Sequence, residues 1–479
     1  MDAQRRYAIV GTGHRARTYI EAITGPYRAV ARIVAFCDPN GARADHYRAA
    51  YGLHDVQIVA PEDFSPLLRQ RRPDVVLVTS PDHTHDTYIC AALAMGIDVI
   101  TEKPMAIDEE RVARIKTAAE NSSARLAVTF NYRYSPRNST VKQLLASGAI
   151  GTVTSVHFEW LLDTAHGADY FRRWHREKSS SGGLLVHKSA HHFDLVNWWL
   201  ADTALSVYAV GGLKFYGEHN ARQRGIPPRP RLGRDLPSGD PFRIDLAADP
   251  ALRALYLDAE ALDGYHRDVD VFADGITTED SLGLVICYQR GATMTYSLSA
   301  FSPWEGYRVA FNGTGGRIEL DVVERSWVAP AAPAEQDARV IDPSAGYTTS
   351  SGPDGPRPSG ERITLQRLWE PAVQIPIPAG ARAHGGGDDL LLRDLFHGAA
   401  DDNLGRVAGY QDGMRSALVG IAANRSLAEG RPVQLAEFGL DCPAPPKLSG
   451  HCPSQLRTSA ATTHSGDAPC KSHISEPRA

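Results

Sequence analysis

The sequence predicts an α/β protein that begins with a doubly wound parallel sheet and continues into a second sheet. Three observations carry this prediction. Short apolar runs alternate with helical patterns over residues 5–133, a glycine-rich turn follows the first run, and residues 152–164 alternate apolar with polar residues at period two. A chain of 479 residues exceeds one ordinary core, so we expect at least two domains.

Composition excludes several classes of protein. The net charge is −5 with both signs interspersed, which gives no electrostatic case for nucleic acid or an anionic membrane. The six cysteines show no CxxC pair and no regular spacing, which indicates reduced thiols. The first strand begins almost at once, and no apolar run is long enough to span a bilayer. We therefore expect a cytoplasmic protein whose partner is a small molecule.

The first element is a short buried strand at residues 6–10, followed by Gly11-Thr12-Gly13-His14-Arg15-Ala16 and a helical pattern. In this setting, G-x-G-x-x-A predicts a dinucleotide site. Gly11 permits the tight turn, Gly13 lets the backbone approach a pyrophosphate, and Ala16 lets helix and strand pack closely. An ordinary strand–helix turn is the alternative.

The second strand, ARIVAFCD, ends at Asp38. A carboxylate in this place accepts hydrogen bonds from the adenosine ribose hydroxyls and repels a 2′-phosphate. NAD is therefore the expected cofactor. NADP is the alternative, because the guanidinium of nearby Arg43 would be able to hold a phosphate.

Three more strands follow, at residues 73–80, 97–104 and 125–133, separated by helical patterns. Ligands of such sheets bind beyond the carboxyl ends of the strands. Polar groups stand at these ends, at 82–85, 102–103 and 131–133. We expect cofactor contacts from the following residues: Gly11, Thr12, Gly13, His14, Arg15, Asp38, Ser80, Pro81, His85, Glu102, Lys103 and Asn131.

Lys103 lies between Glu102 and Pro104, at the end of an apolar strand. Proline restricts the backbone here. We expect the ammonium to point over the nicotinamide, where it would bond a substrate hydroxyl and stabilise alkoxide charge. A solvated lysine paired with Glu102 is the alternative.

Residues 182–199, GGLLVHKSAHHFDLVNWW, concentrate the histidines. His187, His191 and Asp194 recur at offsets of four and three, so on one helix they would share a face. This pattern indicates imidazoles aimed into a cleft. Solvated or hydrogen-bonded histidines are one alternative, and a metal site is another. The metal site is disfavoured by Lys188 and by the lack of a glutamate between the histidines.

The rest of the chain predicts a second domain with insertions. Residues 152–164 alternate at period two as a strand, and 166–183 form a loop of aromatic and charged residues that either lines a sugar site or ties the domains together. Residues 218–280 and 328–362 are expected insertions, and Asp268, Asp270 and Asp274 of the first are expected in solvent. His384 to Gly387 either approach a ligand or open a helix. Residues 441–479 are expected to be a disordered tail.

The motifs GTGHRA, TSPDHTH, TEKPMA, NYRY and GG-x-x-x-x-K-x-x-H-x-x-D occur in this order. As a set they resemble the Gfo/Idh/MocA family, which includes glucose–fructose oxidoreductase and inositol dehydrogenase. The resemblance implies a Rossmann domain over residues 1–130. It implies an α/β domain over 131–440, whose large open, mainly antiparallel sheet forms a homodimer or homotetramer. It also implies hydride transfer between NAD(P) and a secondary alcohol of a sugar, cyclitol or sugar derivative.

By position, Lys103 and His191 match the family's catalytic residues, and Asp194 matches its later aspartate. His187 stands where the family usually has an aspartate, and Ser189 where it has a glycine. A histidine can still accept a proton near neutral pH, so His187 joins the catalytic candidates. The substrate-binding candidates are Tyr132, Arg133, Trp174, Lys188 and Asp194.

The departure at His187 leaves two other functions open. One is a lyase or glycosidase that oxidises its substrate transiently and recycles its bound NAD. The other is a cofactor-binding regulatory protein without turnover. No metal is expected.

Overall fold

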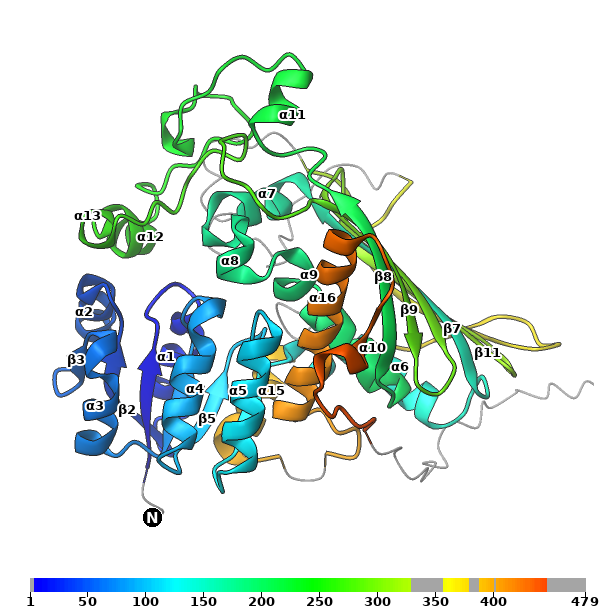
Figure 1. Ribbon diagram of the computed structural model, residues 1–479, viewed down its shortest axis with the longest axis horizontal. Helices are drawn as coiled ribbons and strands as arrows, with labels where there is room; N and C mark the ends of the chain where they lie inside the picture. The colour runs from blue at the N-terminus through cyan, green and yellow to red at the C-terminus, as the bar shows by residue number, and fades with distance from the viewer. Residues whose placement is uncertain (1–3, 329–355, 379–386, 400–401, 446–479) are drawn as a thin grey trace, which may run out of the picture. The chain divides into compact units, whose positions relative to one another are not determined.

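Two sheets and their covering helices make up the chain in the computed structural model, which describes residues 4–328, 356–378, 387–399 and 402–445 (Figure 1). Most of the predicted insertion at 328–362 and of the predicted tail at 441–479 lies outside the described residues, as do residues 384–386. No helix in the described ranges is both long and apolar enough to cross a membrane.

Seven strands of the described chain form sheet A, in the order β15-β6-β5-β4-β1-β2-β3. All neighbours are parallel except β15 and β6, which confirms the predicted doubly wound sheet. The strands are β1 (Arg5–Val10), β2 (Ala31–Cys37), β3 (Gln57–Val59), β4 (Val75–Val78), β5 (Asp98–Thr101), β6 (Leu126–Val128) and β15 (Ala408–Gly409). The flanking helices are α1 (Ala16–Thr24), α2 (Gly41–Ala50), α3 (Phe64–Arg71), α4 (His85–Leu93) and α5 (Glu109–Glu120).

The strand order explains where a ligand would bind. All four residues of β4 are buried, as expected for a parallel strand covered on both faces. The chain runs from β1 through β2 to β3 on one side and returns through β4 to β6 on the other. The direction of winding therefore reverses between β1 and β4, and the crevice beyond their carboxyl ends is the usual ligand position.

Sheet B follows, with nine strands in the described residues and the order β14-β13-β12-β11-β7-β10-β9-β8-β16. Only β7 and β10 pair in parallel in this part of the chain, so the predicted mainly antiparallel sheet is confirmed. The strands are β7 (Val153–Asp163), β8 (Ala204–Gly212), β9 (Ser281–Tyr288), β10 (Thr293–Ser302), β11 (Glu305–Gly313), β12 (Gly316–Arg325), β13 (Gly360–Arg367), β14 (Val373–Ile375) and β16 (Val433–Gln434).

Helix α16 (Tyr410–Glu429) connects the two halves of the fold, because it contacts both β8 and α5 (Figure 1). It also packs on α9 (Leu184–His187) and α10 (Ala190–Leu200). A Cβ atom at Gly420 of α16 would lie 2.4 Å from the carbonyl oxygen of Leu185. The glycine thus lets the α16 backbone press directly on α9, which fixes the helix that ends at His187. Helices α6 (Pro136–Ala146) and α15 (Gly387–His397) complete this layer.

Two local predictions were wrong. Residues 166–183 are not a loop but carry α7 (Thr164–Arg172) and α8 (Lys178–Ser181). Helix α7 begins because the Asp163 side chain accepts hydrogen bonds from the first backbone N–H groups. Asp268 and Asp270 are fully buried rather than solvated, since Arg234 and Arg229 pair with them. The sequence pattern did not indicate that these charged side chains are paired and buried.

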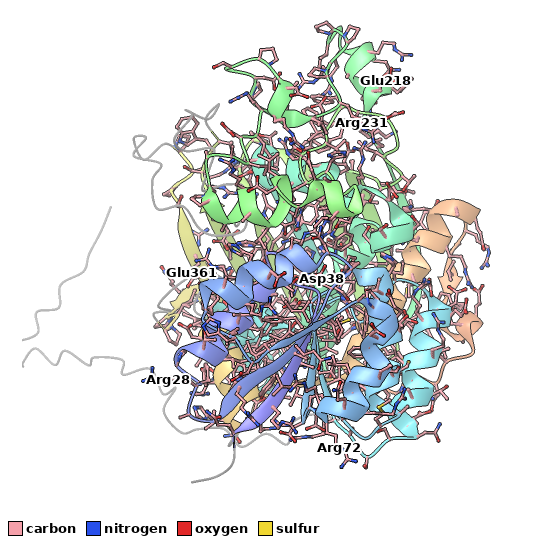
Figure 2. The ribbon with its side chains drawn as sticks, turned by 90° about the vertical axis from the view of Figure 1, so that its left-hand side faces the viewer. Arg28, Asp38, Arg72, Glu218, Arg231 and Glu361 are labelled. Atoms are coloured by element: carbon pink, nitrogen blue, oxygen red, sulfur yellow. The ribbon has the colours of Figure 1, made fainter. Side chains whose placement is uncertain are left out.

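The first insertion contains α11 (Glu218–Gln223), α12 (Pro250–Leu252), a π-helical turn (Arg253–Leu257) and α13 (Glu260–Asp263). It reaches sheet A, where Asn40 Nδ2 donates to the carbonyl of Ala259 at 2.9 Å. Figure 2 shows Asp38 at the edge of sheet A that faces this insertion. The insertion therefore forms part of the surroundings of the predicted cofactor site.

Candidate active site

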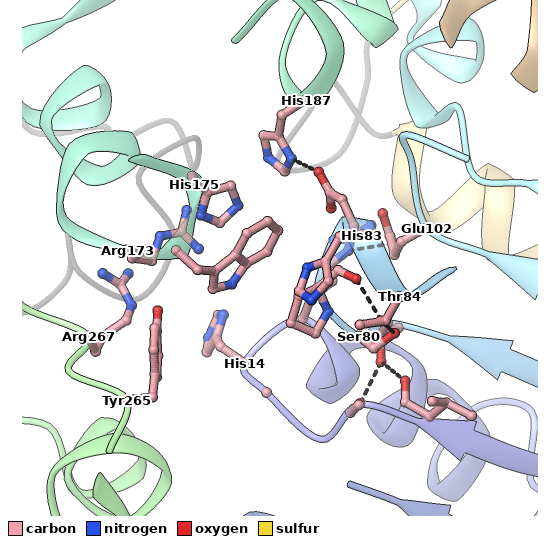
Figure 3. A pocket seen from close by; sticks show the side chains of 18 of the residues that line it. His14, Ser80, His83, Thr84, Glu102, Arg173, His175, His187, Tyr265 and Arg267 are labelled. Atoms are coloured by element: carbon pink, nitrogen blue, oxygen red, sulfur yellow. Dashed lines mark hydrogen bonds and ion pairs between the residues drawn. The ribbon is translucent and has the colours of Figure 1, made fainter. Parts of the chain in front are cut away.

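A cavity of about 710 Å³ lies beyond the carboxyl ends of the strands of sheet A. Its walls come from four parts of the chain: the strand ends of sheet A, the segment from α7 to α10, the turn after β6 and the first insertion (Figure 3). The predicted residues that line it are Gly11, Gly13, His14, Arg15, Asp38, Ser80, Pro81, Glu102, Lys103, Asn131, Tyr132, Trp174, His187, Lys188 and His191.

The glycine-rich turn after β1 forms one end of the cavity. Gly11 has φ +81°, and a Cβ atom there would lie 2.5 Å from the Cα atom of Ser80. Asp38 holds the turn in place, because its Oδ2 accepts from the backbone N–H of Thr12 at 2.6 Å and from the Thr12 hydroxyl at 2.8 Å. Its Oδ1 accepts from the N–H of Asn40. A carboxylate has about four acceptor positions, so one is left for a ribose hydroxyl.

The insertion covers this end of the cavity. The backbone N–H of His14 donates to the Tyr256 hydroxyl at 2.9 Å. Arg43 donates to the carbonyl of Leu255 and forms an ion pair with Asp263 at 2.7 Å. Its guanidinium also lies 5.6 Å from the ring of Tyr256. Arg43 is thus held by the insertion.

Glu102 lies at the end of β5 and ties the glycine-rich turn to this strand. Its Oε1 accepts from Arg15 Nε and from the Tyr19 hydroxyl, each at 2.6 Å. Burial would raise the pKa of Glu102, but Arg15 and Tyr19 outweigh this effect and lower it. Glu102 therefore stays ionised and is paired with Arg15, not with Lys103 as the alternative expectation had it.

Lys103 projects from the end of β5 toward α9, where its Nζ donates to the carbonyl of His187 at 3.1 Å. Burial lowers the pKa of this ammonium, although Asp82 and Glu102 oppose the change. Burial likewise raises the pKa of Asp82, against the effect of Lys103. The cavity thus holds an ammonium and a carboxyl group whose proton affinities are both displaced toward neutral pH, which is common where side chains transfer protons.

The prediction that His187 and His191 lie on one helix is wrong. The helical pattern breaks at Lys188 and Ser189, so His187 ends α9 and His191 lies in α10. His187 Nδ1 instead bonds Asp82 Oδ2 at 2.5 Å. Burial lowers the pKa of His187 well below its usual value, and Lys103 adds to the effect. The imidazole is therefore neutral near pH 7, as a proton acceptor needs to be.

His191 lies over the ring of Tyr132, with the ring centroids 4.5 Å apart. Lys188 Nζ lies 5.8 Å from the ring centroid of the same tyrosine and 5.0 Å from that of Trp160. His192 points elsewhere, since its Nδ1 bonds the Tyr296 hydroxyl at 2.7 Å. Of the two adjacent histidines, His191 is the one that lines the cavity.

Four predicted residues do not line the cavity. The Thr12 hydroxyl donates a hydrogen bond to Asp38. Both ring nitrogens of His85 bond backbone carbonyls, those of Pro104 and Ser80. Arg133 and Asp194, expected to bind substrate, bond each other through Arg133 Nε and Asp194 Oδ2 at 2.7 Å. Both of their side chains are at most 3% exposed, so this pair serves the core rather than the cavity.

Replacing Arg133 with methionine is expected to lower the free energy of unfolding by about 3–5 kcal/mol, because it strands Asp194 as a buried charge. Burial already raises the pKa of Asp194 to about 6, although Arg133 opposes it. Without Arg133 the folded pKa rises further, so the loss is greatest above that pKa and narrows as the pH falls through it. Urea denaturation at two pH values measures this. The double variant Arg133→Met/Asp194→Leu is the control and is expected to regain stability, because it leaves no buried charge. If the free energy of unfolding of Arg133→Met lies within about 1 kcal/mol of the wild-type value, on the order of a surface change, the assignment of this pair to the core is contradicted.

The residues around Asp169 were only partly anticipated from the sequence. Arg173 belongs to residues 166–183, which were expected either to line a sugar site or to tie the domains together, whereas Arg267 and Tyr265 were not singled out. Arg173 and Arg267 both pair with Asp169, at 2.6 and 2.7 Å, and Tyr265 stands beside them (Figure 3). Arg267 and Tyr265 belong to the insertion whose YHRD sequence was interpreted as solvated. Asp82 was recognised only as one of the polar residues after β4. The one sequence signal for Arg267 was its place among aromatic and acidic residues, which could have indicated a paired arginine at a binding site.

In the described residues, no group of three or more histidine, cysteine, aspartate or glutamate side chains is arranged to hold a metal ion. His187 and His191 have separate neighbours, Asp82 and Tyr132. The cluster therefore does not have the geometry of the alternative metal site.

Two family models match the chain. The model described as "Oxidoreductase family, NAD-binding Rossmann fold" matches residues 5–130, and "Oxidoreductase family, C-terminal alpha/beta domain" matches residues 142–435. YteT of Bacillus subtilis, which carries an oxidoreductase name, is 36% identical over 398 residues, covering 78% of this chain and 84% of YteT. An inositol 2-dehydrogenase of Rhizobium meliloti is 29% identical over 208 residues, covering 43% of this chain and 58% of that enzyme.

Solved structures show the same fold at low sequence identity. The WlbA dehydrogenase of Bordetella pertussis, in complex with NADH and UDP-GlcNAcA, has a TM-score of 0.58 at 17% identity, covering 90% of this chain and 99% of WlbA. An aldose–aldose oxidoreductase of Caulobacter crescentus has a TM-score of 0.57 at 17% identity, covering 90% of this chain and all of that one (100%).

Proposed function

The chain belongs to the Gfo/Idh/MocA family of oxidoreductases, and from this premise we propose that it transfers a hydride between NAD and a secondary alcohol of a sugar, cyclitol or sugar derivative. The motif resemblance is thereby confirmed. One observation carries the proposal: a single cavity joins the glycine-rich turn of sheet A to Lys103, His187 and His191. The names of the inositol 2-dehydrogenase and of WlbA support a cyclitol or sugar derivative as the substrate class.

The residues present fit a dinucleotide. Gly11 lets the turn pack closely against Ser80, Gly13 puts no side chain between the turn and the cavity, and Asp38 keeps one acceptor position for a ribose. When bound, the nicotinamide accepts or returns the hydride. Ser80, Pro81, Glu102 and Asn131 complete the wall along which the cofactor would lie.

On the substrate side, His191 takes the hydroxyl proton, Lys103 stabilises the developing alkoxide, and His187 passes the proton on. Aromatic faces suit the C–H surfaces of a sugar, and among the lining rings Trp174 would supply one, since the ring of Tyr132 already stacks on His191 and Trp160. Lys188 beside them would bond hydroxyls. Turnover of cyclitols and sugars by purified protein with NAD tests the proposal; binding of NAD without turnover of any of them counts against it.

NAD is expected to be preferred over NADP. Asp38 would repel a 2′-phosphate, and Arg43 is engaged by Asp263 and Leu255. Asp38→Ala is expected to weaken NAD binding about 10- to 100-fold, the effect of losing charge-assisted hydrogen bonds, and to bring the two affinities closer together. Calorimetric titration with both nucleotides measures this. Asp45→Ala, on the exposed side of α2, is the control; equal NAD affinity in Asp38→Ala and wild type contradicts the role of Asp38.

A second candidate is a redox-neutral reaction, in which the protein retains its cofactor and returns the hydride within one cycle. The observation that favours it is the insertion, whose Tyr256, Leu255 and Ala259 bond the cofactor end of the cavity. A covered cofactor exchanges slowly. Product formed without net NADH, by protein that keeps its nucleotide through dialysis, would support this candidate. Assembly through sheet B and residence in the cytoplasm stay predictions.

A further inference from the structure

The carboxylate nearest His187 comes from a distant part of the chain. Asp82 lies in the short turn after β4, and His187 ends α9, 105 positions later. Their side chains meet at 2.5 Å through Asp82 Oδ2 and His187 Nδ1, and they are 4% and 11% exposed. Figure 3 shows the His187 ring with its dashed hydrogen bond on one side and His175 on the other.

We propose that Asp82 is a positioning residue for the proposed reaction: it holds His187 by Nδ1 and thereby directs Nε2 of that imidazole to pass on the proton that the substrate loses. The inference rests on the proposed function and adds to it a residue that neither the motif pattern nor the family resemblance assigned. It also explains how a histidine works at position 187, where the carboxylate expected from the family pattern is absent.

The hydrogen bond decides the tautomer. Lys103 favours the ionised form of Asp82 against the effect of burial. With Asp82 ionised, its carboxylate accepts from Nδ1–H and the lone pair is on Nε2. The backbone of His187 is held as well, because Lys103 donates to its carbonyl. Residues that follow two strands of sheet A therefore fix His187: Asp82 after β4 holds its side chain, and Lys103 after β5 holds its main chain. Helix α16 packs closely against α9 at Leu185.

The neighbouring charges determine when the pair accepts a proton. His187 and Asp82 face Lys103 and Glu102 from the end of β5, Arg173 and His175 from the segment after α7, and Lys188 beside α9. Burial, with Arg173 and Lys103, lowers the pKa of His175 well below its usual value, so His175 adds no charge. Oxidation of a carbinol releases one hydride, which a bound nicotinamide would accept, and one proton. When that proton reaches Nε2, the new imidazolium is stabilised by the Asp82 carboxylate.

Asp82→Asn tests this inference in the full-length protein with NAD. We expect kcat to fall about 100-fold, within the range for proton-transfer groups, while KM and NAD affinity change little. The acid limb of the pH profile should move to lower pH, because the imidazolium loses its counter-charge. Asp82→Glu keeps a carboxylate and should recover part of the loss. A wild-type kcat and pH profile in Asp82→Asn would overturn the inference.

A double-mutant cycle separates positioning from a structural role. In the His187→Gln background, Asp82→Asn should cost almost nothing further in kcat, because the residue it positions is gone. An equal loss in both backgrounds overturns the inference. A readout without turnover is the low-field proton resonance of His187 Nδ1–H, expected in wild type and absent in Asp82→Asn. If the resonance is present but the protein turns over no substrate, the Asp82–His187 hydrogen bond stands and the proposed reaction is rejected. If the protein turns over substrate without this resonance, the positioning role of Asp82 is rejected.

Discussion

Lys103→Met is expected to lower kcat by about 1000-fold, the scale of losing an electrostatic stabiliser of the transition state. The ammonium lies at the end of β5, inside the cavity and 3.1 Å from the carbonyl of His187. Methionine keeps the length of the side chain but removes the charge that would stabilise an alkoxide. NAD affinity should change far less, because the glycine-rich turn and Asp38 are untouched.

Steady-state kinetics with the best substrate of a cyclitol and sugar panel measures this effect, and calorimetry measures NAD binding. Lys116→Met is the matched control, because Lys116 pairs with Glu120 on the outer face of α5, away from the cavity. Lys103→Met with more than about a tenth of wild-type kcat would mean that this ammonium does not stabilise the transition state.

His191→Gln is expected to lower kcat by about 100- to 1000-fold, since a glutamine cannot accept the hydroxyl proton. Glutamine retains hydrogen bonding and much of the volume over Tyr132, so KM should change less than kcat. The adjacent His192 offers the matched control, because it bonds Tyr296 instead of lining the cavity. His192→Gln should lower the melting temperature yet keep kcat within a few-fold. The reverse ranking of the two variants would assign proton abstraction to another group.

The sequence allowed the cofactor half of the site to be predicted because its signals are local. Gly11, Gly13 and Asp38 follow buried strands directly, and the carboxyl ends of parallel strands meet at one edge. For the same reason Lys103 and the turn at Asn131 were placed at the cavity. The period-two pattern of residues 152–164, which contain β7, likewise predicted a strand of the second sheet.

The substrate half was less predictable, because its contacts join distant segments. The Asp82–His187 bond spans 105 positions and the His14–Tyr256 bond 242. The break between α9 and α10 gave no local signal, so His187 and Asp194 were expected on one helix face. Arg133 and Asp194 resembled ligand-binding groups in sequence, yet they neutralise each other in the core. Charge pairing of this kind depends on packing that no short window of sequence contains.

The most direct test of the proposed function is product analysis of purified protein incubated with NAD and a panel of cyclitols, aldoses and sugar acids. Both the nicotinamide absorbance and the carbohydrate products are followed, so that net oxidation and redox-neutral turnover are both detected. We predict conversion of at least one carbohydrate, lost in Lys103→Met and in His191→Gln. Tight NAD binding with no conversion of any panel member, or conversion that survives both substitutions, would contradict the account.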